Sequence, residues 1–139
     1  MALWNLTPGK GADMRLWRTG PYKFRVVEYS GEPAEMLTNY DYILFDKRYE
    51  GALRTTGAQL QLTPVTVRDE YRKREWRNYQ EATILHTASA EQIWESSPSE
   101  PAIYLSGHSN VFVSTALKEI LQQVAGNSFR FSWGLSWFA

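Results

Sequence analysis

The sequence contains no cysteine, so disulfide bonds, thiolate zinc sites and cysteine nucleophiles are all excluded. Neither charge is in excess, because 15 Lys and Arg residues balance 15 Asp and Glu residues. A dedicated binder of phosphate backbones needs excess positive charge, so nucleic acid is not an expected partner. No stretch approaches the roughly 20 apolar residues of a membrane span, and the first residues lack a signal-peptide pattern. We therefore expect a cytoplasmic protein with no membrane partner.

What is present is an ordinary globular composition with one surplus. The length of 139 residues matches one domain, and 43% hydrophobic against 22% charged residues is normal for a folded chain. Aromatic residues reach 14%, with 6 Trp and 8 Tyr. Such residues either fill a core or anchor a recognition surface. We expect a single domain over residues 1–139 in which the aromatic side chains need a core or a partner.

Apolar periodicity predicts an α+β fold, with a mainly antiparallel sheet and two helices packed against it. The first helix is expected over 46–56, with Asp46 as its N-cap and Gly57 at its end. The second is expected over 114–125, with Ser114 as its N-cap and Gly126 at its end. Alternating patterns predict strands at 22–26, 41–45, 60–67, 79–86, 103–105 and 111–113, and a long aromatic strand at 129–137.

Two stretches of the sequence share one layout. In 43–62 and again in 111–131, a short apolar strand leads through a cap into a helix, a glycine follows, and another strand begins. This layout suggests two similar strand–helix–strand halves, although two copies are fewer than the three or more of a solenoid. The core is expected to bury Leu117, Ile120, Leu121, Phe129 and Phe131 together.

Motifs of common enzymes are missing. The sequence has no Gly-rich phosphate loop ending in Lys-Ser/Thr, no His-Glu-x-x-His pair and no Gly-x-Ser-x-Gly elbow. His86 ends an apolar strand, where a packed histidine is expected rather than a catalytic base, and His108 lies in a turn. Asp41, Asp46 and Asp69 show no ligand spacing. We therefore expect no catalytic residue, metal or cofactor, and keep as the alternative a small enzyme or ligand-binding domain without a recognisable motif.

Residues 68–77 form a charged stretch punctuated by aromatic side chains. A helix, a long hairpin tip or a loop could accommodate it, and we interpret it as an exposed connection because no apolar periodicity would bury it. A solvated loop is the simplest role. Among binding roles a protein partner ranks above nucleic acid, since Arg, Trp and Tyr dominate protein interfaces. The candidate partner-binding residues are Tyr71, Arg72, Arg74 and Trp76.

The C-terminal pattern supplies a family resemblance. Val113 and Ser114 precede an amphipathic helix, then Gly126, then the Phe-x-Phe pair Phe129 and Phe131. This ending resembles family eleven of the bacterial polymorphic-toxin immunity proteins, formerly a domain of unknown function, and the resemblance extends over most of 40–131. It implies a small α+β protein that binds and blocks a cognate toxin domain, and it implies no catalytic residues. The partner expected from the resemblance is therefore a toxin domain.

Overall fold

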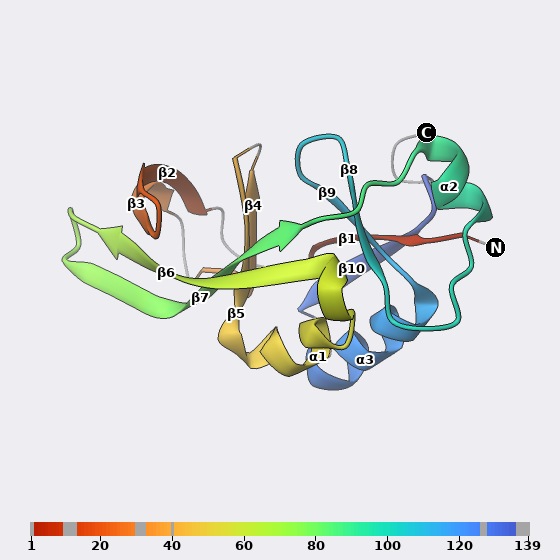
Figure 1. Cartoon of the computed structure of the whole chain (residues 1–139). Coiled ribbons are helices and arrows are strands. Elements are labelled where there is room, and N and C mark those ends of the chain that lie inside the picture. The colour runs from red at the N-terminus through yellow and green to blue at the C-terminus, as the bar shows by residue number, and fades with distance from the viewer. Residues whose placement is uncertain (1, 10–13, 30–32, 40, 126–127, 136–139) are drawn as a thin grey trace.

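The computed structural model describes residues 2–9, 14–29, 33–39, 41–125 and 128–135 (Figure 1). The predicted α+β class, mainly antiparallel with helices packed on the sheet, is confirmed in these residues. The strands are β1 (Trp4–Pro8), β2 (Met14–Gly20), β3 (Lys23–Tyr29), β4 (Met36–Asn39), β5 (Tyr42–Asp46), β6 (Leu60–Asp69), β7 (Arg74–Ile84), β8 (Ile103–Ser106), β9 (Asn110–Val113) and β10 (Phe129–Trp133). The α-helices are α1 (Glu50–Arg54), α2 (Ala90–Glu95) and α3 (Thr115–Ala125), and 3₁₀ turns η1 (Lys47–Tyr49) and η2 (Gly57–Gln59) flank α1.

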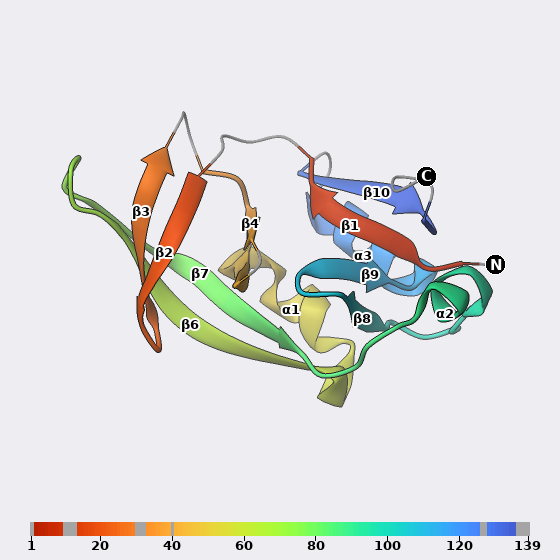
Figure 2. The same ribbon diagram turned by 90° about the horizontal axis from the view of Figure 1, so that it is seen from above.

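The strands form two sheets (Figure 2). One has four strands in the order β10-β1-β9-β8, and the other has six in the order β2-β3-β6-β7-β5-β4. Neighbouring strands run antiparallel except for the parallel pair β3 and β6. None of the helices in the described part of the chain is long and apolar enough to cross a membrane.

The two sheets contain the same strand–helix–strand plan. β5 leads through η1 and α1 into β6, and β9 leads through α3 into β10. In each case the two strands are parallel to each other, with one antiparallel strand between them: β7 in the first unit and β1 in the second. A hairpin partner flanks each unit, β4 beside β5 and β8 beside β9. The strand–helix–strand halves anticipated from the sequence are therefore present, within two four-stranded units that share strand order and direction but differ in where the central strand comes in the chain.

The registers of the two units also agree. In each unit, the residue just before the helix cap pairs with the central strand, and so does the first residue of the strand after the helix. The two partners on the central strand are the same number of residues apart in both units. The pairs are Phe45 with Gln80 and Leu60 with Ile84 in the first unit, and Val113 with Trp4 and Phe129 with Pro8 in the second. The likeness between the units therefore extends to individual residue pairs.

The two predicted caps are confirmed and occupy equivalent places. The carboxylate of Asp46 accepts a hydrogen bond from the Arg48 N–H at 3.0 Å. Ser114 Oγ accepts from the Leu117 N–H at 3.3 Å, and the buried hydroxyl also bonds the loop that precedes β8. The first helix is shorter than predicted, because it starts as the 3₁₀ turn η1 and its α-helical part ends at Arg54. Gly57 follows with φ +66°, and Gly126 lies outside the described residues.

The main core lies between α1, α3 and the sheet faces that meet them. Leu117, Leu121 and Phe129 are buried there as predicted, whereas Ile120 and Phe131, which were also expected to be buried, pack against this core half-buried. Val124, which shares that spacing, is 50% exposed near the end of α3. The predicted apolar face of α3 is thus confirmed over the first two turns of the helix.

A second core lies on the other face of the six-stranded sheet. β6 serves both cores: Leu60 and Leu62 face the main core, and Val65 and Val67 face the second. The change of side predicted around Pro64 is therefore confirmed, and the strand register shifts between Val65 and Val67. The buried members of this second core are Met14, Leu16, Phe24, Ala34, Leu37, Tyr42, Leu44, Val65, Val67 and Tyr79.

Three further expectations about the fold need correction. Residues 68–77 are not a loose connection, because β6 runs to Asp69 and β7 starts at Arg74, leaving a four-residue turn. The C-terminal strand ends at Trp133, since Gly134 at φ +54° turns the chain, and Trp137 lies outside the described residues. His86 is exposed beyond the end of β7 rather than packed.

Candidate protein interface at the hairpin tip

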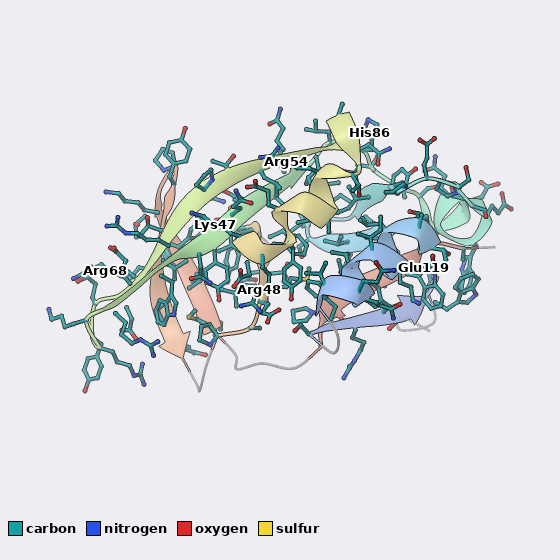
Figure 3. All side chains as sticks on the ribbon, turned by 90° about the horizontal axis from the view of Figure 1, so that it is seen from below. Lys47, Arg48, Arg54, Arg68, His86 and Glu119 are labelled. Atoms are coloured by element: carbon teal, nitrogen blue, oxygen red, sulfur yellow. The ribbon has the colours of Figure 1, made fainter. Side chains whose placement is uncertain are left out.

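Residues 68–77, here called the hairpin tip, form the end of the long β6–β7 hairpin. The tip projects away from α1 and α3 and lies at the left of Figure 1. In the view from the helix side, Arg68 and His86 lie at opposite ends of this hairpin (Figure 3). Tyr71, in the turn, is 91% exposed. A large aromatic side chain this exposed is available for contact with another molecule.

The turn is held by one buried carboxylate. Asp69, 2% exposed, accepts hydrogen bonds from the Arg72 N–H at 3.0 Å and from its guanidinium at 3.2 Å. The Arg72 N–H, assisted by the guanidinium and opposed by burial, lowers the pKa of Asp69 below its ordinary value. Lys73 takes the left-handed conformation, φ 57°, which lets the chain reverse. Tyr71 is therefore presented on a turn of defined shape.

Several charges of the tip neutralise one another. Arg68 pairs with Glu70 at 2.8 Å and with Glu75 at 3.7 Å, and Arg77 pairs with Glu75 at 2.7 Å. Exposed pairs of this kind contribute little to stability. They restrict these long side chains in part, and a partner would have correspondingly less side-chain entropy to remove.

The four predicted contact residues do not form one flat patch. Tyr71 and Arg72 lie in or beside the turn, whereas Arg74 and Trp76 lie on the strand face that leads into the second core. Trp76 is the register partner of Val67 and packs against that core half-buried, with the Arg74 guanidinium 4.8 Å from its ring centre. The expectation that nothing apolar buries this stretch was therefore wrong for Trp76.

The remaining candidate carboxylates make separate structural contacts in the described residues. Asp46 caps a helix and Asp69 closes the turn, while Asp41 and Glu81 both bind Arg18, at 3.1 and 2.6 Å. His108 lines a cavity of about 200 Å³ together with these last two carboxylates. Both carboxylates are paired with Arg18. They raise the pKa of Arg18 above its ordinary value, and the contribution of Glu81 is larger than that of Asp41. Within the described ranges, no group of three His, Asp or Glu side chains could hold a metal.

One exposed aromatic residue of this region was missed by the sequence interpretation. Trp17 in β2 is 65% exposed and lies in the same sheet as the hairpin tip. The alternation of Met14 and Leu16 with Arg15 and Trp17 was the available signal for this strand.

Comparison of the chain with protein-family models, curated proteins and solved structures finds no match.

Proposed function

We propose that this protein is an immunity protein that binds a cognate bacterial toxin domain in the cytoplasm and neutralises it. The resemblance of residues 40–131 to immunity-protein family eleven suggests the class of partner. The observation that carries the proposal is Tyr71, 91% exposed on a turn that Asp69 fixes from inside. Tyr is among the residues that supply most of the energy of protein interfaces.

Preorganisation is the physical reason why the tip suits an inhibitor. An inhibitor must bind tightly, and each side chain or loop ordered on binding reduces the affinity. Here the turn and several of its charged side chains are already held by contacts within the tip. Tyr71 can therefore enter a pocket of the toxin domain without a large loss of chain entropy.

The charges of the tip favour a partner with an acidic or mixed surface. Residues 69–77 carry four basic and three acidic side chains. A nuclease toxin needs a strongly basic surface to hold its substrate, and that surface would be matched better by an acidic inhibitor. We therefore propose a toxin domain that is not a nuclease.

The test starts from the neighbouring open reading frame, whose product should be a larger protein with a toxic C-terminal domain. Expression of that domain should arrest growth, and co-expression of this chain should restore growth. Tyr71→Ala should weaken the purified complex by at least about 2 kcal/mol in calorimetry. Val124→Ala, at an exposed apolar position on α3, is the matched control and should bind normally. A domain that arrests growth and neither binds this chain nor is neutralised by it would overturn the proposal.

A further inference from the structure

A row of four side chains crosses four strands on the face of the six-stranded sheet opposite the second core. Trp17 on β2 is the register partner of Arg25 on β3, Arg25 of Arg68 on β6, and Arg68 of Glu75 on β7. Because the neighbouring Phe24 and Val67 face the second core, these alternate positions share the other face. We call Trp17, Arg25, Arg68 and Glu75 the outer row.

The outer row places two guanidinium-bearing residues opposite each other. Like charges directly opposite on adjacent strands destabilise a sheet unless something compensates them. Arg68 is compensated by Glu70 and Glu75. Arg25 makes no ion pair with any residue that the structure describes. The positive charge of Arg25 therefore stands beside a second cation without a carboxylate of its own.

A cavity of about 480 Å³ lies over this part of the sheet. Its cationic groups belong to Lys23, Arg25 and Arg68, its carboxylates to Glu70 and Glu75, and Thr66 adds a hydroxyl. Three positive charges against two negative charges leave one positive charge in excess. A single carboxylate would balance that excess, and its oxygens could accept hydrogen bonds from the cationic groups of the cavity.

Resting on the proposed function, we propose that this cavity receives the carboxylate of an Asp or Glu side chain on the surface of the toxin domain. Arg25 and Lys23 hold the carboxylate, while the exposed indole of Trp17, the register partner of Arg25 on β2, packs on the apolar surface around it. Arg and Trp are the residue types that most often dominate an interface. The binding surface of the protein then extends from the hairpin tip across the outer row.

The same charges favour a carboxylate over nucleic acid. A phosphate backbone brings many negative charges along one track and is held by a continuous basic surface. Glu70 and Glu75 interrupt such a track here. A single acidic side chain approaching Arg25 meets no comparable repulsion.

A probe that needs no toxin domain tests the site directly. We would titrate the isotope-labelled protein with a hexaglutamate peptide at low salt and follow the NMR signal of the Trp17 indole N–H. The peptide should shift that signal, hexaglutamine should not, and Arg25→Gln should weaken hexaglutamate binding at least about fivefold. Arg15→Gln is the matched control. Arg15, on β2, is exposed like Arg25 on β3, but it is already paired with Glu28 at 3.1 Å.

The outcomes separate this inference from the proposed function. No shift, an equal shift with hexaglutamine, or an equal loss in Arg15→Gln overturns the carboxylate site. Tighter binding of a hexathymidylate oligonucleotide than of hexaglutamate also overturns it, in favour of nucleic acid. If the toxin domain binds and Arg25→Gln leaves its affinity unchanged, this inference fails and the proposed function stands. If hexaglutamate behaves as expected and the toxin domain does not bind, the site stands and the proposed function fails.

Discussion

Asp69 and Arg72 close the turn of the β6–β7 hairpin through one carboxylate, which accepts the Arg72 N–H at 3.0 Å and its guanidinium at 3.2 Å. The carboxylate is buried although the turn around it is exposed. The shape in which Tyr71 is presented therefore depends on an ionised group beneath the surface.

The stability contributed by Asp69 should depend on pH. Because its pKa is lower in the folded chain than in the unfolded chain, the stabilisation is complete above the ordinary Asp pKa of about 4 and is lost as pH falls through the folded value. The difference in unfolding free energy between wild type and Asp69→Asn should therefore be constant from about pH 5 to 7 and shrink below about pH 4. Urea denaturation at each pH measures it. An unchanged difference at acid pH would mean that the ionised carboxylate contributes nothing.

Two aromatic residues of the hairpin tip should behave differently when truncated. Trp76→Ala removes a half-buried indole from the second core and should lower the unfolding free energy by about 1–3 kcal/mol. Tyr71→Ala removes a side chain that is 91% exposed and should change it by less than about 0.5 kcal/mol. Thermal melts of both variants measure the two changes in stability. Equal losses of stability would mean that Tyr71 is packed against other side chains, which contradicts the structure.

The helix face of α3 can be tested with two residues of the same helix. Leu121 is fully buried, and Leu121→Ala should reduce the unfolding free energy by about 2–5 kcal/mol. Val124→Ala, at a half-exposed position, should stay within about 0.5 kcal/mol of wild type. Chemical denaturation of both proteins is the measurement, and a loss below about 1 kcal/mol for Leu121→Ala would contradict the core described here.

Two glycine substitutions should change the stability of the fold in opposite directions. At Gly134, φ is +54° and an added Cβ would lie 2.4 Å from the Trp94 ring, so Gly134→Ala should destabilise the fold by about 1–3 kcal/mol. At Gly51, in α1, nothing lies within 4 Å of the added Cβ. Gly51→Ala should therefore stabilise the protein by about 0.5–1 kcal/mol through helix propensity. Melting temperatures that move in the same direction would contradict the assigned conformations.

Periodicity and capping chemistry predicted the parts of the fold that depend on neighbours in the chain. Ser114 and the spacing of Leu117 and Leu121 were enough for α3, and Asp46 marked the start of the first helix. α2 was missed, although Ser89 and Gln92 form a capping box that the sequence displays as Ser-x-x-Gln. The helix has six residues, and a pattern that short carries little periodicity.

What the sequence could not provide is pairing between distant segments. β1 lies between β9 and β10, and the sequence pattern around Trp4 and Leu6 does not indicate which strands they pair with. The candidate site was limited for the same reason. Tyr71 could be identified as exposed from its neighbours, whereas the opposition of Arg25 and Arg68 exists only because β3 and β6 pair in parallel.

The placement of β1 also sets an order of events during synthesis. In the first unit the central strand β7 directly follows β6, so that unit can assemble as soon as a contiguous stretch of chain has left the ribosome. In the second unit the central strand is made first, and Leu6 must wait for Val111 and Phe131, its partners on either side. Closing this long loop is entropically slow. We expect the six-stranded sheet to nucleate folding and the four-stranded sheet to form last, with the Leu6 strand unpaired until β9 and β10 have been made.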